Sequence, residues 1–563
     1  MIVGIDLGTT HSLIGAWTEK GARLFPNALG ELLTPSVVSV DEHGAISVGQ
    51  AARDRLVSHP ERSVAAFKRW MGSARETTLA GRTFRPEELS ALVLRSLVAD
   101  AEAALGARVT EAVISVPAYF SDAQRKATRA AGELAGIRVE RLINEPTAAA
   151  LAYGLQERHD GGRFLVFDLG GGTFDVSILE LFDGVIEVHA SAGDNYLGGD
   201  DFLDLLVDAC AADLGIDLSS QPRRELGQLR HRLERVKREL SGNVRVRLET
   251  SLGSRECVWE IDEERFAKLA EPLVLRMRQP LERAMRDARL TPQQLDEIVL
   301  VGGASRMPLV ARLVSRMFGR LPLRHVNPDQ AIALGAAVAA GLKSRDERLE
   351  EVILTDVCPY TLGTQVSRRD HTGTHQEGFF HPIIHRNSTV PVSREDTFFP
   401  IHDNQTRLSI DVYQGENPMV AKNIKLGELE IALPAKKPSS ANGVTVRFTY
   451  DINGALQVEA TVLATGERHE LVLEQNPGLL SPEDIRARFA ALAEIKIHPR
   501  DKQENVALLA RAERLYEEHL DARDILQDWI LRFRAVVETQ DERLIREHRE
   551  ELGKALDKLD GGS

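Results

Sequence analysis

The chain contains few cysteines for its length. There are 3 in 563 residues, Cys210, Cys257 and Cys358, and no two of them form a CxxC pair. Isolated cysteines of this kind are typical of buried apolar positions in a protein from a reducing compartment. We therefore expect three buried side chains and a cytoplasmic location.

The features of export and of membrane insertion are also missing. No basic stretch followed by an apolar segment opens the chain, and no apolar run reaches the roughly 18 residues that span a bilayer. The net charge of −14 disfavours a nucleic-acid partner, because an acidic surface repels phosphates. A chain of 62.2 kDa is too long for one hydrophobic core, so we expect several domains.

Neither common nucleotide-binding fingerprint is present. There is no GxxxxGK[ST] loop and no strand-linked GxGxxG, which argues against the P-loop and Rossmann classes. Two other segments resemble each other instead, GIDLGTTHS at 4–12 and FDLGGGTFD at 167–175. Each runs from an apolar strand through Asp into a turn of Gly and Thr, which predicts a hairpin whose backbone N–H groups can contact an anion. One such turn is usually an ordinary tight hairpin, but its duplication favours two phosphate-binding turns.

The two turns carry groups suited to a polyphosphate and a cation. Asp6 and Asp168 begin the turns, where their charges would repel phosphates unless a divalent cation lies between them. The turns themselves contain Gly8, Thr9, Thr10, Gly170, Gly171, Gly172 and Thr173. We predict two phosphate clamps that face each other across Mg²⁺ and a nucleotide.

A second pair of segments supports an internal duplication. NEPTAAALAYG at 144–154 and NPDQAIALGAAVAAG at 327–341 both place Asn and Pro before an Ala-rich helical stretch. Small residues let such a helix pack closely against a sheet or against its counterpart. Two unrelated core helices would not explain the shared pattern, so the sequence predicts two related α/β lobes with a nucleotide cleft between them.

Eight segments, in this order, resemble the ATPase motifs of the DnaK-type heat-shock chaperones. They are GIDLGTTHS, ISVPAYFSDAQRKAT, LINEPTAAALAYGL, FDLGGGTFDVSIL, AGDNYLGGDDF, ERVKRELS, IVLVGGASRMP and NPDQAIALGAAVAAG. Actin-like filament proteins and sugar kinases are similar only in the two hairpins and the adenosine motif, and they are the alternatives. Within the family, the chain most resembles the bacterial HscC-like branch.

The resemblance implies an ATPase whose catalytic residues are Lys68, Glu145, Asp6, Asp168 and Thr173. Lys68 would orient the attacking water, Glu145 would lie near the metal and the water, and Asp6 and Asp168 would hold Mg²⁺ through water. Asp175 would support the second hairpin from behind. By itself, Lys68 beside Arg69 would more often be a solvated surface charge.

The resemblance also implies an ATP or ADP site with an adenosine side. Its expected residues are Gly198, Gly199, Glu234, Lys237, Arg238, Ser241, Gly302, Gly303, Arg306 and Asp329. Glu234 and Lys237 would contact the ribose, Ser241 the adenine, and Arg306 would stack on the base. From spacing alone, Glu234, Lys237 and Arg238 are more typical of a solvated helix face with salt bridges.

The implied fold is α/β, a two-lobed actin-like ATPase domain followed by a β-sandwich peptide-binding domain and an α-helical lid. We expect an ATPase domain at 1–349, a linker at 350–356, the sandwich at 357–480 and a shortened lid at 481–563. The linker, VILTDV, would dock on the lobes in the ATP state, although it can also be read as an ordinary tether. Charged amphipathic helices in the lid are indicated by the stripe of Leu508, Ala512, Leu515 and Tyr516.

The sandwich would hold an extended apolar segment of an unfolded client protein. Leu408 matches the central pocket of the family's groove, and Phe398 and Ile401 match positions that line it, although any one of them could be plain core. The segment 367–384 is longer and more polar than the family's loop, which suggests an altered peptide preference. A J-domain co-chaperone and a nucleotide-exchange factor are the other implied partners, and their identity cannot be read from the sequence.

Overall fold

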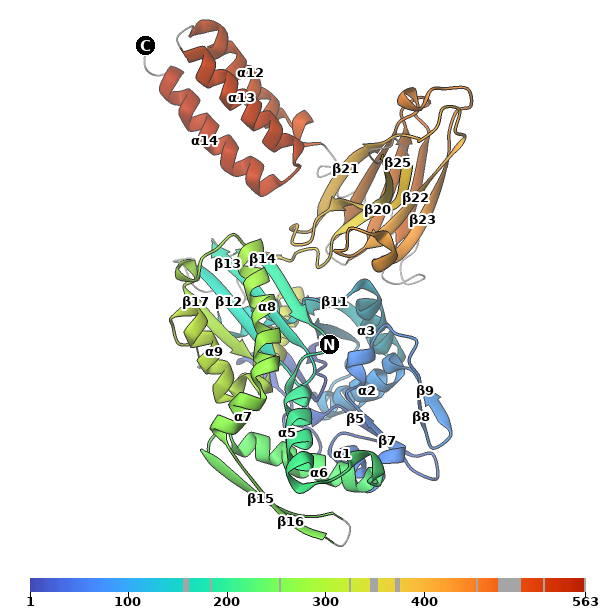
Figure 1. Ribbon diagram of the computed structural model, residues 1–563, viewed down its shortest axis with the longest axis vertical. Helices are drawn as coiled ribbons and strands as arrows, with labels where there is room; N and C mark the ends of the chain where they lie inside the picture. The colour runs from blue at the N-terminus through green and yellow to red at the C-terminus, as the bar shows by residue number, and fades with distance from the viewer. Residues whose placement is uncertain are drawn as a thin grey trace. The chain divides into compact units, whose positions relative to one another are not determined.

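The computed structural model describes residues 1–154, 162–182, 185–252, 255–323, 326–344, 353–369, 375–451, 454–473, 498–519 and 522–560. The chain forms two compact units, Met1–Pro359 and Tyr360–Ser563, and each is described by itself (Figure 1). Within the described ranges, no helix has the length and apolar character needed to cross a membrane.

The first lobe of unit 1 is built on a sheet with the strand order β11-β10-β1-β2-β3, and β4 pairs with β2. Its strands are β1 (Ile2–Asp6), β2 (His11–Thr18), β3 (Gly21–Leu24), β4 (Thr34–Pro35), β10 (Glu111–Val116) and β11 (Arg138–Asn144). A smaller sheet and a hairpin contain β5 (Val37–Val40), β6 (Ile46–Val48), β7 (Ser63–Ala65), β8 (Thr77–Leu79) and β9 (Arg82–Phe84). The helices of this lobe are α1 (Gln50–Ser58), α2 (Pro86–Leu105), α3 (Asp122–Leu134) and α4 (Glu145–Ala152), with 3-10 turns η1 (Pro60–Arg62) and η2 (Phe67–Trp70).

The second lobe repeats this plan. Its sheet has the order β17-β12-β13-β14-β18, made of β12 (Gly162–Leu169), β13 (Phe174–Phe182), β14 (Val185–Asp194), β17 (Glu297–Val301) and β18 (Ile353–Thr355). The helices are α5 (Gly199–Leu214), α6 (Arg223–Glu239), α7 (Glu263–Leu269), α8 (Glu271–Asp287), α9 (Pro308–Phe318) and α10 (Ala331–Lys343). A hairpin is formed by β15 (Arg245–Leu252) and β16 (Arg255–Asp262). The 3-10 turns are η4 (Leu218–Ser220), η5 (Pro292–Gln294) and η6 (Gly303–Arg306).

The two sheets share one pairing scheme, which confirms the predicted duplication. β1 pairs parallel with β10 and antiparallel with β2, and β12 pairs parallel with β17 and antiparallel with β13. In both sheets, therefore, a Gly-rich turn follows the strand that lies between a parallel and an antiparallel neighbour. The two turns occupy equivalent places, as a clamp built from repeated halves requires.

The Ala-rich helices α4 and α10 cross in close contact. A Cβ atom added at Gly335 of α10 would lie 1.7 Å from the carbonyl oxygen of Ala148 in α4. On the other side, a Cβ at Gly4 of β1 would lie 2.2 Å from the backbone of Ala336. These helices are buried among the apolar residues of both lobes, so the small side chains set how closely the two halves approach.

The predicted linker ends as a strand of the second lobe. β18 pairs parallel with β14, with Val185 opposite Ile353 and Glu187 opposite Thr355. The Thr355 hydroxyl donates to the carbonyl oxygen of Ile186 at 3.3 Å, and Thr147 donates to the Asp356 carboxylate at 3.0 Å. The segment is therefore joined to both lobes of unit 1, which is more than a tether requires.

Unit 2 begins with two four-stranded antiparallel sheets. Their orders are β20-β19-β22-β23 and β21-β24-β25-β26. The strands are β19 (Leu362–Arg369), β20 (His375–Ile384), β21 (Val392–Phe398), β22 (Arg407–Gln414), β23 (Ile424–Ala432), β24 (Val444–Tyr450), β25 (Leu456–Val462) and β26 (Arg468–Leu473), with 3-10 turns η7 (Val420–Lys422) and η8 (Ser439–Ala441). On β24 the alternate residues Val444, Val446 and Phe448 are fully buried, as expected for one face of a sandwich.

One expectation about unit 2 was wrong. Segment 367–384, treated as a long polar loop, is mostly strand: β19 runs to Arg369 and β20 begins at His375. Its polar residues His375, Gln376 and Glu377 are consecutive at the start of β20, an edge strand whose side chains can reach solvent without breaking the ladder. Residues 370–374 at the tip lie outside the described residues.

The end of unit 2 is a group of three antiparallel helices, with a short turn η10 (Pro499–Asp501) before them. They are α12 (Gln503–Glu518), α13 (Arg523–Glu538) and α14 (Glu542–Asp560). The predicted stripe is confirmed, because Ala512 and Leu515 are fully buried and Leu508 and Tyr516 pack against the same core. The predicted start of the lid at Ser481 lies outside the described residues, and the proposed domain limits stay predictions.

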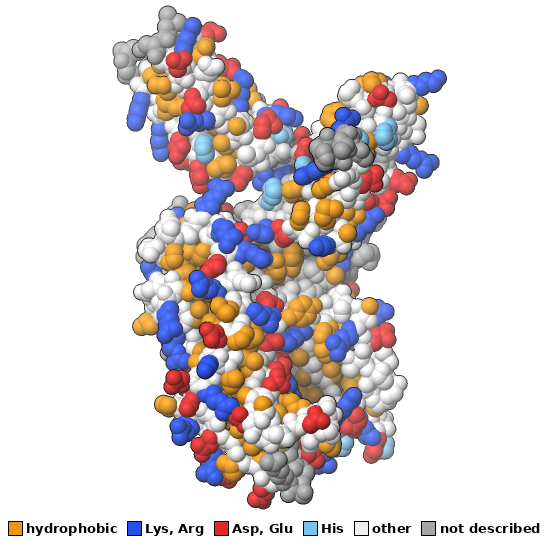
Figure 2. Space-filling model, in the orientation of Figure 1, with side chains coloured by type: hydrophobic (Ala, Val, Ile, Leu, Met, Phe, Trp, Pro, Cys, Tyr) orange, Lys and Arg blue, Asp and Glu red, His pale blue; other side chains and the backbone are white. Residues whose placement is uncertain are grey.

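The visible face of unit 1 carries basic and acidic side chains interspersed (Figure 2).

The three cysteines are buried, with exposed fractions of 0%, 6% and 1% for Cys210, Cys257 and Cys358. The prediction that they fill apolar positions is therefore confirmed.

The crossing of α4 and α10 yields a test of how the lobes are held together. Gly335→Ala should lower the free energy of unfolding of unit 1 by about 3 kcal/mol, because the added methyl collides with backbone that has no room to move. Gly553→Ala in α14 is the matched control, since no atom lies within 4 Å of its Cβ position. That change should leave stability equal or raise it by up to about 1 kcal/mol. Calorimetric melting of the full chain measures both, and equal melting of Gly335→Ala and the wild type would contradict the packing described.

Candidate functional site

A cavity of about 730 Å³ lies between the two lobes of unit 1. It has the size typical of a site for a small molecule or cofactor. Predicted residues that line it are Asp6, Gly8, Thr9, Thr10, Lys68, Glu145, Asp168, Gly170, Gly171, Thr173, Gly199, Glu234, Lys237, Arg238, Ser241, Gly302, Gly303, Arg306 and Asp329. Most of the site predicted from the sequence is thus brought together around one cavity.

The second Gly-rich turn is a tight hairpin closed by its own backbone. Asp168 is opposite Asp175 in the register of β12 and β13, and Gly170 N–H donates to the Thr173 carbonyl at 3.0 Å. Gly302 lies against this turn with a φ of 81°, and a Cβ there would lie 2.4 Å from the Leu169 carbonyl oxygen. Glycine is required at this point, because the left-handed conformation and the contact both exclude a side chain.

Four buried carboxylates form a cluster at the cavity, with Asp6, Asp168 and Glu145 in its lining and Asp175 behind it. Asp6, Asp168, Asp175 and Glu145 are exposed by 7%, 5%, 2% and 5%. Burial, and next the charge of Glu145, raise the pKa of Asp6 and of Asp175 to about 7. The same two causes raise the pKa of Asp168 well above its ordinary range. The cluster thus carries more negative charge than this cleft accommodates without a cation.

Lys68 supplies positive charge to this cluster. Its ammonium donates to Glu145 Oε1 at 2.9 Å, and the two side chains are only 4% and 6% exposed. The alternative of a solvated surface lysine is therefore wrong. The 3-10 turn η2, which follows Ala66 in a left-handed conformation, directs Lys68 inward.

A third loop, at the start of α5, is joined to the second turn. Gly199 N–H donates to the carbonyl of Gly170 at 2.9 Å, and Asp200 N–H donates to Gly171 at 2.8 Å. The Lys237 ammonium donates to the Gly199 carbonyl at 2.7 Å. These bonds fix the loop beside the second Gly-rich turn.

The expected adenosine side is made of paired charges. Glu234 accepts from Lys237 at 2.7 Å and from Arg238 at 2.9 Å. The helical salt-bridge face read from the spacing therefore exists, and it also lines the cavity. Arg306 donates to Asp329 at 2.5 Å and to Asn327 at 2.6 Å, which links η6 to the start of α10.

Three predicted residues stand behind the cavity wall. Gly172, Asp175 and Gly198 do not line it. Asp175 instead accepts from the backbone N–H of Tyr119 in the first lobe at 3.2 Å, which agrees with a supporting position. A Cβ at Gly198 would lie 2.4 Å from the backbone nitrogen of Gly172, so both glycines serve the contact between two loops.

Sequence reasoning missed two lining residues that face each other. Arg53 Nη1 lies 3.3 Å from His11 Nε2, and burial lowers the pKa of His11 to about 4. His11 belongs to the quoted segment GIDLGTTHS and could have been found there. Arg53 comes from α1, which carries no motif, and only the fold brings it to the cavity.

The predicted groove residues of unit 2 lie at the end of β21, in the turn that follows it and near the start of β22. Leu408 is half-buried on β22, while Ile410 on the same face is only 2% exposed. Phe398, half-buried at the end of β21, contacts the His381 imidazole edge to face with ring centres 5.4 Å apart, and His381 lies 2.8 Å from Asp396. Ile401 is half-buried in the turn that follows β21. The sequence offered no signal for the His381–Asp396 pair.

Two related lobes, two Gly-rich turns and a cleft with buried carboxylates and lysine define a class: an actin-like nucleotide-binding ATPase domain. Here that domain is followed by a β-sandwich and a helical lid. Comparison with known proteins agrees with this class. The chain belongs to the Hsp70 family, whose family model, described as Hsp70 protein, matches residues 2–78 and 73–562.

Curated relatives match over most of their length. The chain is 41% identical to the chaperone protein DnaK of Thermotoga neapolitana over 529 residues, which covers 91% of this chain and 87% of the relative. It is 40% identical to that of Thermosipho africanus, with coverage of 91% and 86%, and 39% identical to that of Thermotoga petrophila, with coverage of 96% and 93%. The match includes the sandwich and the lid. Neither is needed by a filament protein or a sugar kinase, so the match argues against both alternatives. Membership of the HscC-like branch stays a prediction.

The raised pKa values lead to a test of the buried cluster. The pKa of Asp175 rises from its ordinary value of 3.8 to about 7, so the folded carboxyl keeps a proton that the unfolded one has lost. Without metal or nucleotide, the free energy of unfolding of unit 1 should therefore fall as pH rises from about 4 to about 7, and level off above.

Melting curves in a chelator at several pH values measure this slope. Asp175→Asn should reduce it, because the amide still accepts from Tyr119 N–H but has no proton to lose. Asp204→Asn, at a half-exposed carboxylate of α5, is the control and should melt with the wild-type slope. If Asp175→Asn kept the full slope, the buried carboxyl would not be the titrating group.

Proposed function

We propose which residues of this chain, an ATP-dependent chaperone of the Hsp70 family, carry out ATP hydrolysis and which bind the client peptide. The observation that carries the proposal is the buried Lys68–Glu145 pair beside Asp6 and Asp168, between the two phosphate turns. ATP hydrolysis requires an oriented water and compensation of charge on the terminal phosphate. These are the groups in the cavity that can provide both.

In this proposal, Lys68 orients the attacking water and offsets the charge that develops on the transferred phosphate. Glu145 accepts from the Lys68 ammonium at 2.9 Å and holds the lysine in place. Thr9 and Thr173 donate hydroxyls to the terminal phosphate, and the backbone N–H groups of the turns bind the other phosphate oxygens. The adenosine lies along Gly302 and Gly303, between Arg306 and the face of α6 that carries Glu234, Lys237, Arg238 and Ser241.

The carboxylates suit a magnesium ion that is held through water. Oδ2 of Asp168 is buried and has no hydrogen-bond partner among the described residues. No group of three or more His, Cys, Asp or Glu side chains in the described ranges could ligate a metal. Mg²⁺ keeps most of its waters and needs few direct carboxylates, so Asp6 and Asp168 fit it. When bound, the ion would neutralise charge on the phosphates.

Lys68→Ala should abolish most hydrolysis and leave nucleotide affinity within a few-fold of wild type. The reason is that the ammonium acts on the water and on the developing charge more than on the bound ground state. Single-turnover hydrolysis of ATP and a nucleotide titration measure the two quantities separately. Hydrolysis by Lys68→Ala at close to the wild-type rate would remove Lys68 from the mechanism.

We further propose that β18 transmits the nucleotide state to unit 2. The strand pairs with β14, which continues to Asp194 at the edge of the third loop. ATP would favour this paired state only if it binds it better than ADP does, because a ligand shifts an equilibrium by its difference in affinity. A J-domain co-chaperone and a nucleotide-exchange factor would regulate the cycle.

In unit 2 we propose that Leu408, Phe398 and Ile401 hold an apolar side chain of an extended client segment. Leu408 is half-buried, whereas Ile410 and Val412 on its face are almost fully buried. A partly exposed apolar residue at the end of a buried row suits a pocket wall better than plain core. A cytoplasmic location is proposed with the same function.

The substitution Leu408→Phe tests whether Leu408 lines a pocket or belongs to the core. If Leu408 lines the pocket, the larger ring should fill it and weaken binding of an apolar peptide, with normal melting and normal basal ATPase. Ile410→Phe is the matched control, since overpacking a buried site should destabilise the sandwich by about 1–3 kcal/mol. Fluorescence anisotropy of a labelled Leu-rich peptide, beside melting of the full chain, measures both. Unchanged peptide affinity in a stable Leu408→Phe protein would contradict the pocket.

A further inference from the structure

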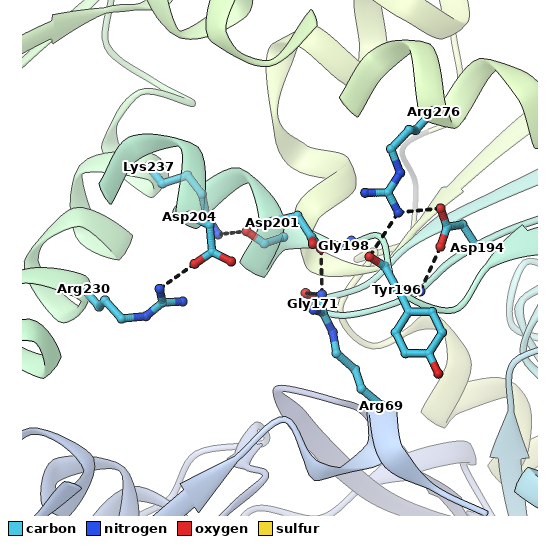
Figure 3. A network of polar contacts seen from close by, with 11 residues as sticks. Arg69, Gly171, Asp194, Tyr196, Gly198, Asp201, Asp204, Arg230, Lys237 and Arg276 are labelled. Atoms are coloured by element: carbon cyan, nitrogen blue, oxygen red, sulfur yellow. Dashed lines mark hydrogen bonds and ion pairs between the residues drawn. The ribbon is translucent and has the colours of Figure 1, made fainter. Parts of the chain in front are cut away.

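Arg69 extends across the cleft from the first lobe to the second (Figure 3). It follows Lys68 in η2, and successive side chains of a 3-10 turn point about 120° apart. Lys68 therefore enters the carboxylate cluster while Arg69 reaches the phosphate loops of the other lobe. Its Nη2 donates to Asp201 Oδ2 at 2.7 Å and to the Gly171 carbonyl at 3.5 Å.

The acceptor of Arg69 is itself held in place. Asp201 lies in the first turn of α5, and the Oδ2 that receives Arg69 also accepts from Gly198 N–H at 2.8 Å. The Gly171 carbonyl also accepts from Asp200 N–H at 2.8 Å. The guanidinium therefore joins both loops of the second lobe that flank the phosphate position.

The contact is close and shielded from water. Arg69 and Asp201 side chains are 17% and 20% exposed. A Cβ added at Gly172 would lie 2.5 Å from Arg69 Nε, so the stem of the arginine lies directly on the phosphate turn. Nε is buried and has no hydrogen-bond partner among the described residues. An ion pair in such surroundings is screened less than one on an open surface.

We propose that Arg69 is a positioning residue for ATP hydrolysis, which clamps the lysine-bearing segment of the first lobe onto the phosphate loops of the second. The inference rests on the proposed role of Lys68. A side chain tied to Asp201 fixes η2, and with it the ammonium of Lys68, relative to the turn that binds the phosphates. The same ion pair joins the lobes across the cleft, so it also slows the opening through which nucleotide leaves.

Arg69→Met keeps the apolar stem and removes the clamp. It should release nucleotide about tenfold faster and hydrolyse bound ATP about tenfold more slowly, as expected for the loss of a charge-assisted hydrogen bond in a shielded place. Asp201→Asn should give the same pattern, because the amide oxygen still accepts from Gly198 N–H but loses its charge. Release of a fluorescent nucleotide and single-turnover hydrolysis measure the two effects.

Three comparisons distinguish a clamp from a structural contribution. The double variant should be no worse than either single variant, since both remove the same ion pair. Arg69→Lys should be intermediate, because it retains charge but not the planar donor geometry. Arg276→Met is the matched control: it breaks the ion pair of Arg276 with Asp194, at 2.6 Å, within the second lobe alone, and should release and hydrolyse as wild type.

Wild-type release and hydrolysis by Arg69→Met would overturn the proposal, and so would additive effects of the two single changes. Lys68→Ala, measured beside them, keeps the two proposals apart. Normal hydrolysis by Lys68→Ala would remove the proposed role of Lys68, while fast release by Arg69→Met would still support the clamp. If Lys68→Ala hydrolysed ATP slowly while Arg69→Met released nucleotide and hydrolysed ATP as wild type does, the role of Lys68 would be supported and the clamp would be excluded.

Discussion

Burial of charge where the two lobes meet is the constraint on which the rest of unit 1 depends. Asp6, Asp168, Asp175 and Glu145 lie almost out of contact with solvent, and Lys68 is the cation that pairs with one of them. Ionised groups in such a place raise one another's pKa values and oppose folding unless charge is balanced. The cleft is therefore suited to a ligand that arrives with cations, as a nucleotide with Mg²⁺ does.

The surrounding scaffold makes this burial possible without side chains that fill the cleft. Gly302 and the glycines of the turns leave backbone as the lining, and Gly335 lets α10 contact α4 at the level of the backbone. The carboxylates then come from strand ends of both lobes, β1 and β12, and from the start of α4. A rigid scaffold with polar groups at strand ends is the usual way to place a ligand between lobes of α/β structure.

Ion pairs and strand pairing join these lobes to one another and to the chain that follows. Arg69 crosses the cleft to Asp201, and β18 adds to the sheet of the second lobe beside β14. Arg69 reaches the loops beside the second Gly-rich turn, whereas β18 pairs with Val185–Glu187, at the opposite end of β14 from Asp194. The route proposed from the nucleotide to the segment that follows unit 1 therefore runs along the length of β14.

The amino-acid sequence by itself determined the duplicated lobes, the two phosphate turns and most residues of the cavity. The lobes and turns follow from local patterns that occur twice in the chain, whereas residues such as Lys68 and Glu145 were expected from the family resemblance. It also predicted the sandwich and the helical stripe, whose periods of two and of three to four residues are visible in the chain.

Only the tertiary structure decided the rest. Whether Lys68 faces solvent or Glu145 depends on the left-handed Ala66 that precedes it and on a helix 77 residues away. The partner of Arg69 lies 132 residues further along the chain, and Arg53 reaches the cavity from a helix without any motif. Segment 367–384 reads as a loop because its polar residues hide the pattern of an edge strand, and the pairing of β20 with β19 makes it mostly strand. Contacts between distant segments carry no local signal, so they appear only when the fold brings them together.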